Sequence, residues 1–169
     1  MLAPCVGIVD VMATLLFVCW GNICRSPMAE RVARRRADEL GLDVRIESFG
    51  VSNEEEGNPI DRRAARILEQ HGYDASGHRA RKIGARDIAS ADLVVAAEPM
   101  HVSRLQRIAP GATNLVLLND FNPDKPEGES LVDPWYGTED GFQETLADIE
   151  AAVDGVLAAV TRGRAHAGR

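Results

Sequence analysis

The most distinctive spacing lies near the start of the chain, where five residues separate Cys19 from Arg25 and Ser26 follows at once. An apolar run at 13–19 predicts a buried strand before this segment, and Ser26-Pro27 is typical of a helix start. A loop between a strand and a helix can point its backbone N–H groups at one centre, and the helix N-terminus adds its positive dipole end. The segment is therefore predicted to bind a tetrahedral anion such as phosphate.

The side chains of this loop suit phosphate chemistry. Gly21 and Asn22 tolerate the left-handed backbone that a tight loop requires. Arg25 has a planar guanidinium that can hold two phosphate oxygens at once. The same positive field favours a thiolate at Cys19, and Ser26 can donate its hydroxyl to that sulfur. We expect Cys19 to be a nucleophile, whereas the alternative interpretation is a small buried residue at a strand end.

Cleavage of a phosphate ester also needs a proton donor for the leaving group and a base that activates water. One carboxyl can serve both steps in turn. The candidate is Asp133, because Pro134 biases the residue before it toward an extended conformation in a predicted loop. An Asp-Pro pair on its own is most often a turn, so the pair alone leaves this role open.

Strand-like and helix-like segments alternate along the chain. After the first strand at 13–19, further strands are expected at 44–49, 92–97 and 114–118, and helices are expected at 26–41, 61–71, 100–108 and 138–160. The first helix is expected to turn Ala29, Val32, Ala33, Ala37 and Leu40 inward. The last has one apolar stripe, formed by Phe142, Leu146, Ile149, Val153, Val156, Leu157 and Val160. This alternation predicts a three-layer α/β/α fold with a four-stranded, mostly parallel central sheet and a phosphate-binding loop after its first strand.

Composition limits the class of protein. The chain has 169 residues and a formal net charge of −7, which argues against a nucleic-acid surface or an anionic membrane surface. All three cysteines lie in the first 24 residues, too few and too clustered for a disulfide scaffold, so we expect a reducing, cytoplasmic setting. No histidine or cysteine spacing suits a metal, so neither a metal nor a cofactor is predicted.

The ends of the chain are expected to lie outside the domain. The apolar stretch before residue 17 lacks a positive start and is interrupted by Asp10, so it predicts neither a signal peptide nor a membrane span. We expect 1–12 to be a dispensable extension in which Cys5 has no role, 13–162 to be a single domain, and 163–169 to be a flexible tail. A monomer or weak dimer is expected.

Segment 18–30, VCWGNICRSPMAE, resembles the signature of low-molecular-weight protein tyrosine phosphatases. The similarity continues in the same order through GNP-D at 57–61, H-x-A-R at 78–81 and DPWYG at 133–137. It implies that Cys19 attacks phosphorus to form a phosphocysteine, that Arg25 and the loop amides bind phosphate, and that Asp133 is the acid and then the base. Phosphotyrosine proteins or peptides would be the substrates, and inorganic phosphate a product and inhibitor. Classical tyrosine phosphatases differ, because they place a histidine where this chain has Val18.

The resemblance assigns further roles around the phosphate. The residues that would surround it or the substrate ring are Trp20, Gly21, Asn22, Ile23, Cys24, Ser26, Trp135 and Tyr136. Ser48 and His78 would join Asn22 and Ser26 in a hydrogen-bond network, although a plain structural histidine fits His78 equally. Trp135 and Tyr136 would contact the ring, or else only anchor their loop. Glu54 stands where the family often has an aromatic residue, which implies an acidic rim that disfavours acidic phosphopeptides.

Cys24 and the related activities leave alternatives open. Cys24 would form a reversible disulfide with Cys19, or is a buried thiol without a redox role. Arsenate reductases of this fold use further cysteines, and none follows Cys24. Phosphoarginine phosphatases have a threonine where this chain has Ile23. A phosphopeptide-binding module without catalysis would be expected to lack Cys19 or Asp133.

Overall fold

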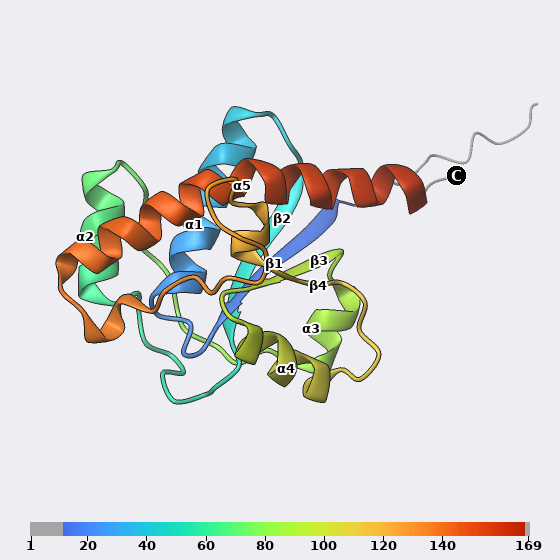
Figure 1. Ribbon diagram of the computed structural model, residues 1–169, viewed down its shortest axis with the longest axis horizontal. Helices are drawn as coiled ribbons and strands as arrows, with labels where there is room; N and C mark the ends of the chain where they lie inside the picture. The colour runs from blue at the N-terminus through green and yellow to red at the C-terminus, as the bar shows by residue number, and fades with distance from the viewer. Residues whose placement is uncertain (1–11, 168–169) are drawn as a thin grey trace, which may run out of the picture.

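The structure is a computed structural model that describes residues 12–167, with side chains described as far as residue 163. Cys5 and the rest of segment 1–11 lie outside the described residues. The centre of the molecule is a four-stranded sheet in the order β2-β1-β3-β4 (Figure 1). Its strands are β1 (Ala13–Cys19), β2 (Val44–Gly50), β3 (Leu93–Ala96) and β4 (Leu115–Leu117). Each adjacent pair is parallel, so the sheet expected to be mostly parallel is parallel throughout.

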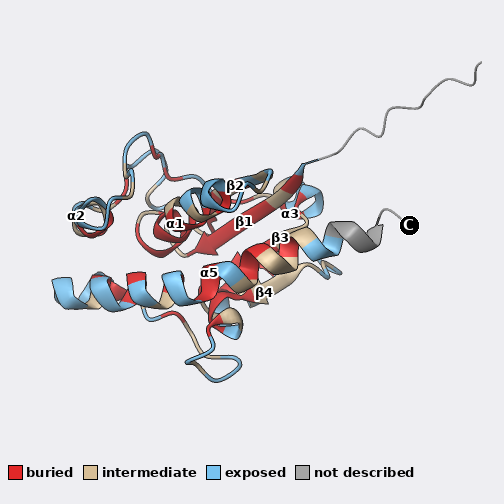
Figure 2. Ribbon diagram, turned by 90° about the horizontal axis from the view of Figure 1, so that it is seen from above, coloured by how far each residue is buried: buried red, intermediate tan, exposed pale blue. Residues whose placement is uncertain are grey.

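Helices cover both faces of the sheet. The strand residues alternate between two cores, since Leu15 and Phe17 pack with α1 (Arg25–Glu39) and α5 (Glu139–Ala167). Leu16 and Val18 belong to the core on the other face, which holds α3 (Ala85–Ser90) and α4 (Pro99–Ile108). The helix α2 (Arg62–Gln70) packs against α5. Figure 2 shows the buried residues concentrated along β1 and on part of α5. The predicted three-layer α/β/α fold is confirmed.

Local sequence explains most of these elements. β1 is buried almost from end to end, as expected of a central strand covered on both faces. The predicted apolar stripe of α5 is confirmed, because each of its seven residues is buried. α2 begins after Asp61, whose carboxylate accepts a hydrogen bond from the Arg63 backbone N at 2.9 Å. α4 begins at Pro99, a residue that suits the first turn of a helix.

Four details differ from the sequence-based expectations. α1 begins at Arg25 with Cys24 as its N-cap, because the Ser26 hydroxyl bonds to groups of the loop and the neighbouring strand instead of capping the helix. Leu40, expected to face inward, is 47% exposed because the helix ends at Glu39. The short helix α3 was not expected, since its six residues have only one buried side chain and show no period. α5 continues to Ala167, beyond the expected helix end at residue 160.

The order of the strands decides where a ligand site is expected. β2 lies beside β1 on one side, and the chain then crosses to β3, which lies beside β1 on the other side. In a parallel sheet, the carboxyl ends of two strands separated in this way open a crevice. Residues 20–24 follow β1 at this crevice, and residues 97–98 follow β3.

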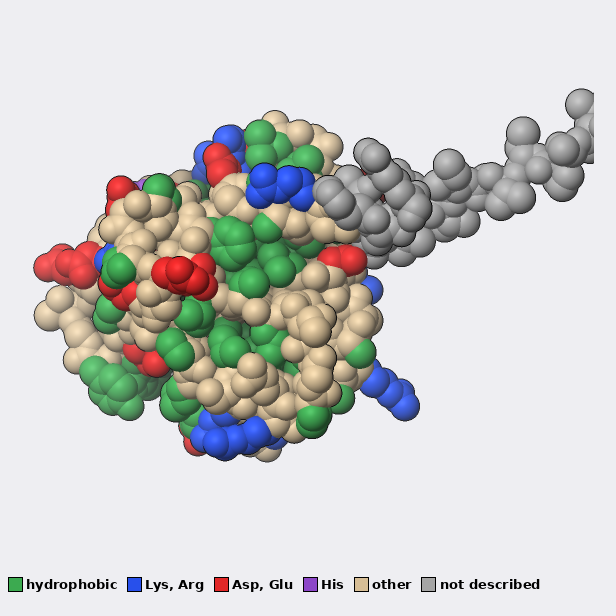
Figure 3. Space-filling view, turned by 45° about the vertical axis from the view of Figure 1, so that its right-hand side comes forward, with side chains coloured by type: hydrophobic (Ala, Val, Ile, Leu, Met, Phe, Trp, Pro, Cys, Tyr) green, Lys and Arg blue, Asp and Glu red, His purple; other side chains and the backbone are tan. Residues whose placement is uncertain are grey.

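On the face drawn in Figure 3, Lys and Arg side chains lie in small separate groups rather than in one continuous patch. No helix within residues 12–167 is long and apolar enough to cross a membrane.

Candidate active site

The loop at residues 20–24 is held in a tight curve by Asn22. Its backbone φ is 61°, and it is the one non-glycine residue with a left-handed backbone among the described residues. Its side-chain Nδ2 donates to Ser26 Oγ at 2.9 Å and to Ser48 Oγ at 3.0 Å, while its Oδ1 accepts from the Arg81 backbone N at 3.0 Å. Gly21, the other residue of the loop that tolerates a left-handed backbone, does not adopt one. The strained residue is therefore fixed by its own amide group.

Cys19 lies at the floor of this loop against Ser26. Its side chain is buried, and its Sγ lies 3.0 Å from Ser26 Oγ. Ser26 also donates to the carbonyl oxygen of Phe49 at 3.2 Å, although its hydroxyl has only one proton. A thiol at Cys19 can donate to Ser26 while Ser26 donates to Phe49. A thiolate requires that Ser26 turn its proton to the sulfur.

A cavity of about 280 Å³ opens above the loop. The expected site residues that line it are Cys19, Trp20, Gly21, Ile23, Cys24, Arg25, Glu54, Asp133, Trp135 and Tyr136. The expected residues Asn22, Ser26, Ser48 and His78 are buried and do not line the cavity. Glu55 is an additional wall residue, and its side chain lies against Gly21. The structure thus separates residues that can touch a ligand from residues that hold the loop.

Arg25 joins the loop to two distant parts of the chain. Its side chain is almost completely buried, and its Nη2 pairs with Asp133 Oδ2 at 3.2 Å. Its Nη1 donates to the carbonyl oxygen of Leu131 at 2.8 Å and forms an ion pair with Glu98. Leu131 is itself bound to the end of β3, since its N donates to the Ala97 oxygen at 2.8 Å. The guanidinium therefore connects the phosphate loop with the segment that carries the candidate acid.

Glu98 is a site residue that the sequence interpretation missed. It follows β3 directly, at the crevice where the strand order reverses, and its carboxylate pairs with Arg25. An acidic residue at the end of a central strand was the available signal.

Asp133 has one carboxylate oxygen fixed and the other directed at Arg25. It precedes the short 3₁₀ helix η2 (Pro134–Tyr136), and its Oδ1 accepts from the Trp135 backbone N at 3.1 Å. The side chain remains about one-third exposed. The carboxyl is thus held at the edge of the cavity, where water or a substrate oxygen can reach it.

The cavity lining contains both aromatic and acidic side chains. Trp135 is 40% exposed and Tyr136 is 91% exposed. The Arg63 guanidinium stacks 5.1 Å from the Trp135 ring and donates to the Trp135 carbonyl oxygen at 3.1 Å. Glu54, also in the lining, accepts through Oε2 from Trp20 Nε1 at 3.0 Å. The cavity therefore offers exposed aromatic rings together with carboxylates.

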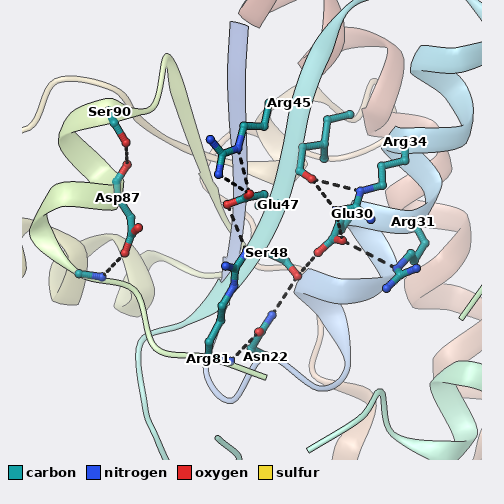
Figure 4. Close-up of polar contacts among 12 residues, drawn as sticks. Asn22, Glu30, Arg31, Arg34, Arg45, Glu47, Ser48, Arg81, Asp87 and Ser90 are labelled. Atoms are coloured by element: carbon teal, nitrogen blue, oxygen red, sulfur yellow. Dashed lines mark hydrogen bonds and ion pairs between the residues drawn. The ribbon is translucent and has the colours of Figure 1, made fainter. Parts of the chain in front are cut away.

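A polar chain extends behind the loop to the surface. Figure 4 shows Glu30 between Ser48, which donates to its carboxylate, and Arg34, whose Nη2 lies 2.7 Å from the other carboxylate oxygen. Ser48 is in turn bonded to Asn22. Glu30 is buried, and sequence reasoning missed it although an acidic residue on the inner face of a helix was a signal. The carboxylate anchors the network that shapes the loop.

His78 contacts the same loop from its other side. Its Nε2 lies 2.6 Å from the carbonyl oxygen of Asn22, so this nitrogen must be the donor. Burial lowers the pKa of His78, and a neutral ring can still donate this hydrogen bond.

Cys24 is a second buried thiol at the cavity. Cys19 and Cys24 are both free in this structure. Burial, with a smaller contribution from the charge of Asp61, raises the pKa of the Cys24 thiol well above its usual value. Cys24 is therefore protonated at neutral pH and is a poor nucleophile.

Comparison with known proteins identifies the family. Residues 14–166 match the family model of low molecular weight phosphotyrosine protein phosphatases. The chain belongs to this family. A low molecular weight protein-tyrosine-phosphatase from Streptomyces coelicolor is 43% identical over 150 residues, which cover 85% of this chain and 91% of the relative. Low molecular weight protein-tyrosine phosphatase A from Mycobacterium tuberculosis is 39% identical over 143 residues, covering 83% and 86% of the two chains.

The fold agrees with solved structures of the family. The crystal structure of a protein tyrosine phosphatase from Entamoeba histolytica matches with a TM-score of 0.84 and 27% identity, covering 90% of this chain and 99% of that one. This phosphatase is therefore an enzyme of the low molecular weight class, with bacterial relatives among those it resembles.

Proposed function

We propose that this phosphatase hydrolyses phosphotyrosine in proteins through a phosphocysteine at Cys19. The observation that carries the proposal is the single cavity shared by Cys19, Arg25 and Asp133. The sulfur attacks phosphorus, an S–P bond forms, and the P–O bond to the tyrosine phenol breaks with its electron pair on the phenol oxygen. Arg25 and the amides of residues 20–24 stabilise the charge on the three remaining oxygens. Water then cleaves the S–P bond and releases inorganic phosphate.

Entry of phosphate changes the partner of Arg25. An incoming dianion competes with Asp133 for Arg25 Nη2, the group that pairs with Asp133 Oδ2 in this structure. Asp133, released from that ion pair, is free to take a proton and to donate it to the phenol oxygen. It then accepts a proton from the water that attacks the phosphocysteine. The Ser26 hydroxyl stabilises the sulfur before attack and when it leaves.

The walls of the cavity support an aromatic substrate with a preferred charge around it. Trp135 and Tyr136 provide a surface for the phosphotyrosine ring, and Ile23 adds an apolar contact in the loop. Glu54 and Glu55 place carboxylates in the lining of the same cavity, so acidic peptides are repelled more than basic ones.

Cys24 lines the same cavity as Cys19 and is proposed as its redox partner. A mild oxidant such as a peroxide would convert the Cys19 thiolate to a sulfenic acid, and attack by Cys24 sulfur would then expel water and form the disulfide. The raised pKa of the Cys24 thiol makes this step slow at neutral pH.

The substitution Cys19→Ser tests the mechanism, with p-nitrophenyl phosphate as substrate. We expect turnover to be lost, because a serine hydroxyl at this position is a far weaker nucleophile than a thiolate. Binding of inorganic phosphate should survive, and circular dichroism should confirm the fold. Undiminished hydrolysis by the Cys19→Ser protein would reject a phosphocysteine intermediate.

Phosphoarginine remains the second candidate substrate. A panel of otherwise identical peptides that carry phosphotyrosine or phosphoarginine compares the two directly by released phosphate. We expect the phosphotyrosine peptide to be preferred, because Ile23 and the aromatic rings of the cavity suit a phenyl ring. A preference for phosphoarginine would keep the phosphatase chemistry but replace the substrate.

A further inference from the structure

His101 is a buried histidine that has no role in the proposed reaction steps. It is 0% exposed, and neither of its ring nitrogens has a hydrogen-bond partner. Polar groups that are buried without a partner are rare and destabilising, so each one calls for a physical reason. A phenylalanine or leucine would fill the same space without that cost.

The position of His101 points to the phosphate site. It lies in the first turn of α4, three residues after Glu98, the partner of Arg25. Burial and the charge of Arg25 lower the pKa of His101 to about 4, while the charges of Glu98 and Asp133 act in the opposite direction. The ring is therefore neutral at pH 7, with one N–H donor and one acceptor nitrogen.

Glu98 is the acceptor best placed for that donor. The His101 backbone N donates to the Glu98 carbonyl oxygen at 3.0 Å, and the charge of the Glu98 carboxylate acts on the His101 ring, so the two side chains lie near each other. Glu98 is the N-cap residue of α4, yet its side chain does not cap the helix. In this structure Asp133 is bound through both oxygens, one to Arg25 and one to the Trp135 backbone, and the oxygen released from Arg25 by phosphate is the one proposed to face the substrate phenol. Arg25 and Arg104, the cations that also act on His101, cannot accept a hydrogen bond.

We propose that His101 is a positioning residue for Arg25 and acts through Glu98. When phosphate displaces Asp133 from Arg25, the His101 N–H donates to the Glu98 carboxylate and fixes its orientation. Glu98 then holds the guanidinium in the plane in which two of its N–H groups face two phosphate oxygens. The inference rests on the proposed phosphate site at residues 19–26.

The test compares His101→Phe with His101→Asn and His101→Gln. The Phe variant keeps a buried ring without polar atoms, whereas Asn and Gln restore a donor at the positions of the two ring nitrogens. Inorganic phosphate is titrated, and its binding is followed by tryptophan fluorescence, because both tryptophans of the chain, Trp20 and Trp135, line the cavity. The kcat and KM for p-nitrophenyl phosphate and the Tm are measured alongside.

We expect phosphate to bind at least about fivefold more weakly to His101→Phe, with a Tm that is unchanged or higher because two unpaired polar atoms are gone. At least one of the amide variants should bind phosphate within about twofold of the parent. In a Glu98→Gln background, His101→Phe should cause little further loss, because the two residues act as a unit.

Three results would overturn the inference. The first is a His101→Phe protein that binds phosphate as well as the parent. The second is an equal loss of affinity in the Phe, Asn and Gln variants, which would show that ring shape and not hydrogen bonding matters. The third is a full additional loss in the Glu98→Gln background. A parent protein that neither binds phosphate nor hydrolyses p-nitrophenyl phosphate would reject the proposed function itself, and the inference with it.

Discussion

The guanidinium group of Arg25 has two roles in the proposed mechanism. It is buried and neutralised by Glu98, so the positive charge needed for phosphate is held in place before a substrate arrives. It also pairs with Asp133 through Nη2, the nitrogen that an incoming phosphate would bind. The proposed mechanism therefore couples binding of substrate to release of Asp133 at a single residue.

Asp133→Asn separates acid catalysis from binding. The amide keeps an oxygen that accepts from the Trp135 backbone but cannot deliver a proton. We expect kcat for phenyl phosphate to fall by about 10²- to 10⁴-fold with little change in KM. Steady-state kinetics with phenyl phosphate and p-nitrophenyl phosphate measure the effect, and the loss should be smaller for p-nitrophenol, the better leaving group. Equal losses for both substrates would argue against proton donation.

Residue types and spacing predicted the loop but not every partner of its side chains. Cys19 and Arg25 were predicted from their local pattern and Asp133 from the resemblance of its segment to the family, and the structure places all three at one cavity. Glu98 lies 73 residues from Arg25 in the chain, so only the sheet order brings them together. Glu30 was missed because its role comes from the hydrogen bond that it accepts from Ser48, which belongs to another element.

At the scale of elements, the end of β2 supports the phosphate loop from behind. Gly50 pairs with Cys19 across the two strands, and a Cβ placed at Gly50 would lie 2.7 Å from the Trp20 carbonyl oxygen and 3.1 Å from the Gly21 carbon. Because the atoms nearest to Gly50 belong to the backbone, neither the strand nor the loop can move aside easily to make room for a Cβ. The loop is shaped by the neighbouring strand as well as by its own residues.

Gly50→Ala is therefore expected to push the loop out of position. We expect a loss of stability of about 1–3 kcal/mol, as for other overpacked sites, and a fall in kcat/KM of at least about tenfold. Urea denaturation and p-nitrophenyl phosphate kinetics measure the two effects. Gly163→Ala is the matched control, because a Cβ there meets nothing within 4 Å, and it should leave both quantities near the parent. Activity of Gly50→Ala at the parent level would show that the loop does not depend on this contact.

The larger elements could be predicted from periodicity, and their ends could not. The α5 stripe and the apolar run of β1 are long or apolar enough to stand out in the sequence. The start of α1 was placed one residue late, because Ser26-Pro27 has the pattern of a helix cap while the Ser26 hydroxyl is engaged with Cys19 and Phe49. Tertiary contacts at the active site therefore override a local signal.

At the scale of the whole molecule, buried histidines make the fold sensitive to acid. Burial lowers the pKa of both His78 and His101, the latter to about 4, whereas histidines of an unfolded chain titrate near about 6.5. As the pH falls below about 6.5, the unfolded chain takes up protons that the folded protein does not bind. This part of the stability is present above that pH and is lost as the pH falls through about 4.

We expect the free energy of unfolding to decrease by about 2 kcal/mol between pH 7 and pH 4.5 from His101 alone. Urea denaturation at several pH values measures the slope. His101→Phe is the control, because removal of the titrating ring should make the slope shallower. The same slope in both proteins would show that His101 titrates normally in the folded state.

The ion pair of Arg25 and Asp133 joins positions 108 residues apart in the chain. During synthesis on the ribosome, β1 and the phosphate loop emerge first, long before the acid and the α5 helix that covers β1. A nascent chain that ends before Asp133 thus displays the cysteine and arginine of the loop without the carboxyl proposed as acid and base. On the proposed mechanism, full activity arrives only with the last quarter of translation, and we expect a fragment that ends before residue 133 to lack it.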